Sequence, residues 1–132
     1  MTAEEVIASA RRCVGARFRA QGRDPATGLD CVGVAAAAVN SDPPPARYSL
    51  RGGHWRQLAM VAEAMGLQTV FPGEERAGDL LMVEAGPGQL HMIVMVPGGY
   101  VHADARLRRV VEAPGAPPWP VLAAWRGCDD ED

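Results

Sequence analysis

Cys31 lies where a thiol could act as a nucleophile. The segment Gly28–Gly33 has the sequence Gly-Leu-Asp-Cys-Val-Gly, which ends a loop rich in Gly and Pro and begins an alanine-rich run. Unpaired N–H groups and the positive end of the dipole at a helix start stabilise a thiolate, the form that attacks carbonyl carbons. We therefore predict that Cys31 is a catalytic nucleophile, with a small core residue as the alternative.

Two histidines follow on consecutive apolar runs, and they could complete such a site. The turn Pro97-Gly98-Gly99 predicts a hairpin that places His91 and His102 on adjacent strands, where a bulge or stagger would bring them close. His91 would accept the proton of Cys31 to give a thiolate–imidazolium pair, and His102 would orient its ring. The alternatives are a hydrogen-bonded core role for His91 and orientation by Asp104 in place of His102.

The first half of the chain must position the cysteine, and its periodicity is helical. Thr2 and Glu5 form a capping box, and apolar residues then recur at helical spacing. Residues 16–30 show no sustained period and are expected to be a loop. The predicted helices are Ala3–Val14, Cys31 to about Asn40, and about His54 to Met65.

The second half must position the histidines, and from Gly78 onward its period is that of strands. Helices followed by strands predict an α+β domain in which N-terminal helices pack on a C-terminal antiparallel meander of about five strands. The predicted strands are Asp79–Val83, Leu90–Val96, Tyr100–Ala103, Arg109–Glu112 and Val121–Trp125.

Length and charge exclude several classes of protein. The chain of 132 residues fits a single domain over 1–132, with an acidic, flexible tail at 127–132. The net charge of −3 and the dispersed arginines argue against nucleic-acid binding. We expect no membrane span, because no segment is long and apolar enough.

The cysteines and the start of the chain suggest where the protein works. Three cysteines without a CxxC pair argue against a disulfide framework or a zinc ribbon, and we expect Cys13 to be a packing residue and Cys128 an exposed thiol. Acidic residues at the start do not fit a secretory leader. We therefore expect synthesis in the cytoplasm without a signal peptide, and access to its substrate by delivery or release.

An ordered set of motifs resembles a known family. The order is Gly15-x-x-Phe18-x-x-x-Gly22-Arg23, Leu29-Asp30-Cys31-Val32-Gly33, Gly78-Asp79-Leu80-Leu81, His91-Met92-Ile93-Val94 and Val101-His102-Ala103. This set, from Ala10 to about Glu112, is similar to the NlpC family (NlpC/P60) of papain-like cell-wall cysteine peptidases, and most of all to its short, leaderless branch in phage tails and gene-transfer particles.

The resemblance implies a fold, a site and a substrate. It implies a papain-like fold with the cysteine at a helix N-terminus, and a triad of Cys31, His91 and His102 without cofactor or metal. It also implies that the substrate is an amide of peptidoglycan stem peptides, commonly between D-glutamate and a diamino acid, and that phage-tail or gene-transfer-particle proteins are partners.

The sequence departs from the family pattern at two places, of which the one at Val32 should matter little if that side chain faces the core. Val32 stands where the family usually has Ser, and Arg17-Phe18 stands where it has Pro-Tyr. Phe18 keeps the ring but loses a hydroxyl donor, and removing one oxyanion donor can cost a hydrolase on the order of 100-fold in rate. Gln21 or the Cys31 N–H are the candidates to replace that donor.

Charged residues before the cysteine have two interpretations each. Asp30 can cap the second helix, which would stabilise it by about 1 kcal/mol, yet its charge opposes formation of a thiolate. Arg17, Arg19 and Arg23 could bind carboxylates of an anionic stem peptide or could be plain surface charges.

Other function classes remain open on the sequence. A non-catalytic tail or wall-binding component would keep the fold and have an unreactive Cys31. A metal hydrolase would use Cys31, His91 and His102 as ligands, although their spacing matches no zinc motif. Related amidases and acyltransferases share the same Cys–His order.

Overall fold

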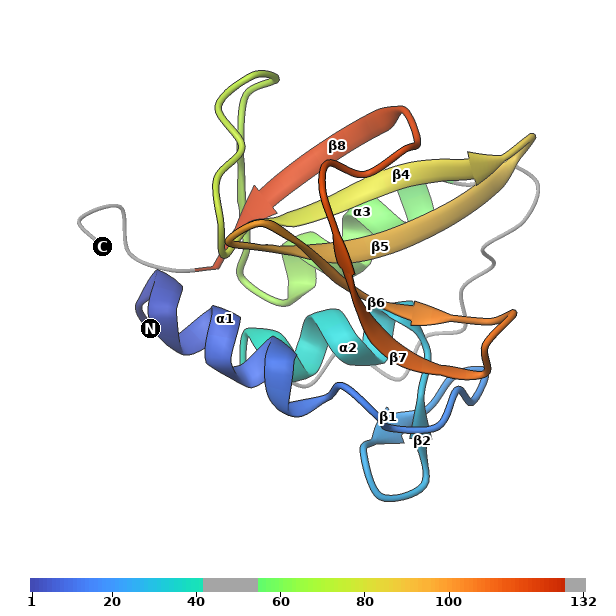
Figure 1. Cartoon of the computed structure of the whole chain (residues 1–132). Coiled ribbons are helices and arrows are strands. Elements are labelled where there is room, and N and C mark those ends of the chain that lie inside the picture. Colours follow the sequence, from blue (N-terminus) through green and yellow to red (C-terminus); the bar gives the residue numbers. More distant parts are fainter. Residues whose placement is uncertain (42–54, 128–132) are drawn as a thin grey trace.

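The described part of the chain is an α+β domain in which three helices lie on one side of an antiparallel sheet (Figure 1). The computed structural model describes residues 1–41 and 55–127, and for Trp55 only the backbone. The predicted fold class is therefore confirmed. The helices are α1 (Ala3–Arg12), α2 (Cys31–Ala38) and α3 (Trp55–Ala64).

The three helices begin close to where the sequence predicts. The capping box of α1 forms, because Thr2 Oγ1 accepts from the Glu5 N–H and Glu5 Oε1 accepts from the Thr2 N–H, both at 3.1 Å. Asp30 is the N-cap of α2. The second and third helices end at Ala38 and Ala64, slightly earlier than predicted, and His54 and Cys128 lie outside the described residues.

Within residues 1–41 and 55–127 the sheet has six strands, and its order departs from a simple meander. The spatial order is β3-β8-β4-β5-β6-β7, so the C-terminal strand returns to lie between β3 and β4. The strands are β3 (Gln68–Thr69), β4 (Leu80–Gly86), β5 (Gln89–Val96), β6 (Gly99–Asp104), β7 (Arg109–Pro114) and β8 (Val121–Arg126).

Three short strands and the place of β8 differ from the prediction. Residues 16–30, expected to be a loop, contain a two-stranded ribbon of β1 (Arg23–Asp24) and β2 (Gly28–Leu29). These strands and β3 have two residues each, which is too short for an alternating pattern to be visible in the sequence. The meander holds from β4 to β7, but β8 pairs with β4, a contact that no local pattern encodes.

The two faces of the sheet have different surroundings. On the helix face, defined by Leu90, Met92 and Val94 of β5, apolar side chains pack against α1 and α2 in the main core. On the outer face, defined by Leu81, Val83, Ile93 and Tyr100, a smaller apolar cluster includes the half-buried Trp119. Because successive side chains of a strand point to opposite faces, neighbouring residues of β5 enter different surroundings.

The pairing between β5 and β6 is short. It joins Val94–Val96 to Gly99–Val101 next to the hairpin turn at Pro97-Gly98, and Val94↔Val101 is its last pair. Beyond this pair, β5 continues along β4, and β6 continues along β7. Within the described residues, β5 and β6 do not pair with each other there. We call residues 91–93 and 102–104 the β5–β6 split; α2 packs against both strands.

An ion pair fixes β8 against the start of β4. Both carboxylate oxygens of Asp79, which is fully buried, accept from the Arg126 guanidinium at 2.8 and 2.9 Å. Asp79 also accepts from the Arg76 N–H at 2.9 Å. The pair therefore explains the Gly-Asp-Leu-Leu motif as a structural feature that anchors the inserted strand.

No helix among the described residues is long and apolar enough to cross a membrane.

Candidate active site at the β5–β6 split

Cys31 is the first residue of α2, and its surroundings are apolar and closed. The side chain is 2% exposed, and both described cysteines, Cys13 and Cys31, are free thiols. The backbone N–H groups of Met92, Val32 and Cys31 itself lie close enough to the sulfur to stabilise a thiolate. The Met92 N–H belongs to the β5–β6 split, so the sulfur lies at the place where the sheet pairing is interrupted.

Burial decides the protonation state of this thiol. Desolvation, and secondly the negative charge of Asp30, raise the pKa of Cys31 from 9.0 to about 12, although the three N–H groups act in the opposite direction. The sequence predicts that the helix start favours a thiolate, and this expectation is wrong for the resting protein. Desolvation outweighs the helix-terminus effect, so Cys31 is a neutral thiol at pH 7.

Asp30, beside the cysteine, is buried and its carboxylate accepts several hydrogen bonds. Its Oδ1 accepts from the Gly33 N–H at 2.8 Å, which is the N-cap bond of α2, and from Arg23 Nη1 at 3.2 Å. Its Oδ2 accepts from the Gln21 N–H at 3.0 Å. Both interpretations of Asp30 are therefore correct, because it caps the helix and also raises the pKa of the thiol.

The loop before α2 is held by close backbone packing. A Cβ on Gly33 would meet the Gly22 carbonyl oxygen, and a Cβ on Gly22 would meet the Gly28 carbonyl oxygen. These contacts leave no room for a side chain at either position. The two glycines of the motif thus allow the loop to reach the first turn of α2.

His91 and His102 come together on the outer face of the sheet. His91 Nε2 lies 2.8 Å from His102 Nδ1, and the rings meet edge to face with their centroids 5.1 Å apart. His91 alternates with Met92 on β5, and His102 alternates with Val101 on β6, so both rings point away from the main core. The pair can form because the β5–β6 split leaves room between these strands.

Aromatic rings enclose the histidine pair. Trp119 meets His91 and His102 edge to face, with ring centroids 5.6 and 5.8 Å apart, and Tyr100 lies 5.1 Å from His102 and 5.8 Å from Trp119. The sequence pattern did not identify either aromatic residue as part of the site. The alternation of Tyr100 with His102 could have placed that tyrosine on the same face, whereas Trp119 lies between prolines where no periodicity exists.

The enclosed histidines are neutral. Burial, and secondly the neighbouring His102, lower the pKa of His91 from 6.5 to about 4, while Asp104 acts in the opposite direction. Burial also lowers the pKa of His102. Cys31 and His91 are therefore a thiol and a neutral imidazole at rest, and the described contacts of Cys31 and His91 do not join them directly.

The remaining predicted substrate residues surround the loop and differ in what they contact. Phe18 is half-buried against the main core, and Arg17 is exposed. Gln21 is exposed with a left-handed backbone, φ 60°, and its described bond is the backbone donation to Asp30. Arg23 bonds Asp30 and the Gly22 carbonyl, so its contacts are within the protein.

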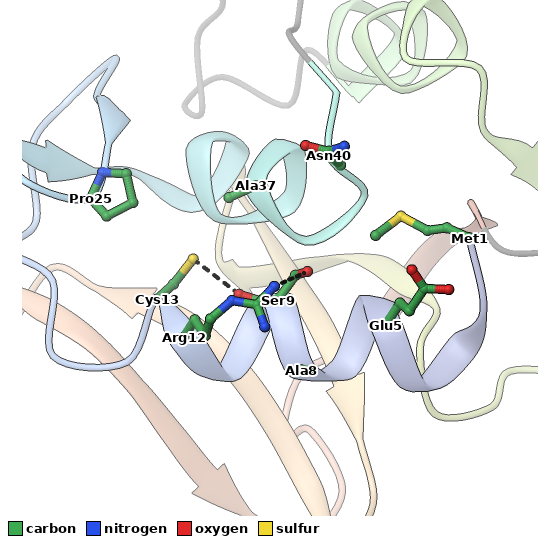
Figure 2. A pocket seen from close by; sticks show the side chains of 9 residues that line it. All are labelled: Met1, Glu5, Ala8, Ser9, Arg12, Cys13, Pro25, Ala37 and Asn40. Atoms are coloured by element: carbon green, nitrogen blue, oxygen red, sulfur yellow. Dashed lines mark hydrogen bonds between the residues drawn. The ribbon is translucent and has the colours of Figure 1, made fainter.

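A pocket of about 540 Å³ lies away from this site, between α1 and α2 (Figure 2). Cys13 lines it, and its sulfur donates to the Ser9 carbonyl at 3.5 Å. Cys13 is buried in the main core, as predicted for a packing residue. The pocket contains neither Cys31 nor a histidine. In the part of the chain that is described, no three His, Cys, Asp or Glu side chains are grouped to hold a metal ion.

Sequence comparisons find no relative of this chain. No protein-family model matches it, and no curated protein sequence matches it significantly.

Structural comparisons, in contrast, agree with one another. The NlpC/p60 domain of the peptidoglycan hydrolase SagA superposes with a TM-score of 0.60 at 21% identity, over 86% of this chain and 90% of that domain. NlpC1 from Trichomonas vaginalis superposes with a TM-score of 0.65 at 17% identity, over 94% of this chain and 43% of that protein.

A third structure shows that this fold also exists without activity. RipD from Mycobacterium tuberculosis, described as a non-catalytic NlpC/p60 domain protein adapted to peptidoglycan binding, superposes with a TM-score of 0.52 at 18% identity, over 94% of this chain and 95% of that one. At these identities the comparisons establish the fold. The chain has the NlpC/p60 fold, as its motif order predicts.

Proposed function

We propose that this chain is a cysteine hydrolase that cleaves an amide bond in the stem peptides of peptidoglycan. The observation that carries the proposal is the His91–His102 hydrogen bond at the β5–β6 split, where the Met92 N–H lies close to the Cys31 sulfur. The NlpC/p60 fold and the peptidoglycan hydrolase among its structural neighbours support it. Cleavage between D-glutamate and a diamino acid, and delivery by a phage-like particle, are finer parts of the same proposal.

The histidine tautomers follow from the hydrogen bond. If His91 donates its Nε2–H to His102 Nδ1, then His91 Nδ1 carries a lone pair and can accept a proton. His102 then carries its own proton on Nε2. His102 is thus an orienting group that also stabilises the imidazolium of His91, though less than a carboxylate would.

The reaction starts from neutral groups. The Met92 N–H, next to His91, lies close to the Cys31 sulfur, so the two side chains meet through the β5–β6 split in the proposed reaction. As the Cys31 sulfur bonds to the substrate carbonyl carbon, its proton passes to His91 Nδ1, and the oxyanion forms near the backbone N–H groups at the start of α2. The C–N bond then breaks, and the leaving amine takes the proton from His91. Water attacks the thioester, its proton passes to His91, and the departing thiolate recovers that proton.

A non-catalytic, peptidoglycan-binding role is the second candidate. Two observations favour it: the Cys31 side chain is 2% exposed with a pKa raised to about 12, and Phe18 lacks the hydroxyl of the family tyrosine. The structural similarity to RipD shows that the fold is compatible with such a role.

One experiment separates the two candidates. Wild type and Cys31→Ala are incubated with purified diaminopimelate-type peptidoglycan, with a reductant, across pH 5 to 9, and soluble products are identified by mass spectrometry. Stem-peptide fragments from wild type alone would establish the hydrolase and identify the bond. Pelleting with the wall without any product from either protein would establish the binding role.

A further inference from the structure

Two arginines lie opposite each other beside the histidine pair. Arg17 forms an antiparallel bridge with Arg109, the first residue of β7, and the Phe18 N–H donates to the Arg108 carbonyl at 3.0 Å next to it. Partners in such a bridge direct their side chains to the same side. Because both side chains are exposed, two guanidinium groups share one surface.

That surface is the outer face of the sheet. Arg109 is the register partner of Asp104 on β6, so their side chains point the same way. Asp104 in turn lies two residues beyond His102, and residues two apart on a strand share a face. The two arginines therefore lie on the face that carries the histidine pair.

Arg17 is also tied to the loop that carries the cysteine. Its carbonyl accepts from the Leu29 N–H at 2.8 Å, two residues before Cys31. The Arg17–Arg109 pair is consequently anchored on one side to the nucleophile loop and on the other to the β6–β7 hairpin beside the histidines.

The charges of this pair are only partly balanced within the described residues. Like charges directly opposite each other on neighbouring strands destabilise a sheet. The described salt bridges use Arg11, Arg23 and Arg126, and neither Arg17 nor Arg109 takes part in one. The carboxylate of Asp104, the register partner of Arg109, offsets at most one of the two positive charges, and its Oδ1 accepts from the Arg106 and Leu107 N–H groups at 2.8 and 3.0 Å.

We propose that Arg17 and Arg109 form a carboxylate-binding subsite that holds the free α-carboxylate of the glutamyl residue next to the amide to be cleaved. Guanidinium groups bind carboxylates through two parallel hydrogen bonds, and a bound carboxylate removes the repulsion between them. This inference rests on the proposed function, since it takes the stem peptide as the ligand.

The test is a pair of stem peptides that differ only in this group, one with the free α-carboxylate and one with the α-carboxamide. Binding of each to the Cys31→Ala protein is measured by calorimetry. We expect the carboxylate peptide to bind at least roughly tenfold more tightly, as charged hydrogen bonds require. In Arg17→Gln and Arg109→Gln we expect the ratio of the dissociation constants of the two peptides to approach 1.

Controls separate charge from structure and from catalysis. Arg12→Gln removes an exposed arginine of α1 that bonds Ser9 and lines the separate pocket between α1 and α2, and it should keep the full preference. Arg17→Lys keeps the charge and should retain part of it. The two glutamine variants should unfold at or above the melting temperature of the parent, because they remove a like-charge contact.

The outcomes are distinct. Equal binding of the two peptides, no binding of either, or a preference that survives in both Arg17→Gln and Arg109→Gln would overturn the subsite. Cleavage is measured separately with wild type. A carboxylate preference without cleavage would count against the hydrolase alone and leave the subsite standing.

Discussion

The two sides of the β5–β6 split have opposite character. On the helix face, Cys31 lies beneath close-packed aliphatic side chains of α2 and β5. On the outer face, His91 and His102 lie among the rings of Trp119 and Tyr100. Each side disfavours charge by burial, which raises the pKa of the thiol and lowers the pKa of His91. The comparison shows that Cys31 and His91 are both neutral at rest, so in the proposed reaction charge would develop only as the substrate reacts.

The largest effect on activity should come from replacing Cys31, which lies on the helix face. Cys31→Ala should reduce peptidoglycan hydrolysis by about 10³-fold or more, since removing a nucleophile leaves only residual catalysis. Release of soluble stem peptides measures it. Cys13→Ala is the matched control, because Cys13 is an equally buried free thiol one helix away and should keep its activity. Equal losses in both variants would assign the effect to packing.

On the outer face, the two histidines should differ in importance. His91→Gln removes the proton acceptor and should cost about 10²- to 10⁴-fold in kcat. His102→Gln keeps an oxygen that can accept from the His91 ring, so it should cost less. Initial rates on a soluble stem peptide measure both. If His102→Gln is the more damaging, the roles of base and orienting group are reversed.

The aromatic enclosure should set the protonation of the base. Trp119→Ala admits water to the histidines, so the pKa of His91 should rise from about 4 toward 6.5, followed by NMR of the ring protons. Trp119→Phe keeps an aromatic ring over the pair and should shift the pKa less. An unchanged pKa in Trp119→Ala would show that the strands, and not this ring, exclude water.

The smallest effects should appear in stability against pH. Folding lowers the pKa of His91, so the unfolded chain binds more protons, and the free energy of unfolding should fall as pH decreases from 6.5 toward 4. Folding raises the pKa of Cys31, so stability should also fall as pH rises from 9 toward 12. Melting curves recorded across this pH range measure both effects. His91→Gln should lose the fall in stability at acid pH, and Cys31→Ala should lose the fall at alkaline pH. If a variant keeps both pH dependences, the group that titrates is not the residue that was replaced.

What the sequence predicts well is local. Thr2 with Glu5 and Asp30 predict the starts of α1 and α2 because a cap depends on three or four neighbouring residues. The Pro97-Gly98 turn likewise predicts the hairpin that brings the two histidines onto neighbouring strands.

What the sequence could not predict depends on contacts between distant segments. The pKa of Cys31 depends on burial under β5 and on Asp30, and the helix start alone predicted the wrong charge. Trp119 and the Arg17–Arg109 bridge join segments that no periodicity connects. The catalytic roles of Cys31, His91 and His102 stay predictions, which the variants above test.

The insertion of β8 between β3 and β4 has a consequence for synthesis of the protein. Strand β8 occupies an interior position of the sheet. Its Arg126 forms an ion pair with Asp79, which is 47 residues earlier in the chain. Until that strand leaves the ribosome, β4 is an edge strand with unpaired N–H and C=O groups. Completion of the sheet is therefore a long-range event that must wait until β8 has been translated, about 35 residues after β4.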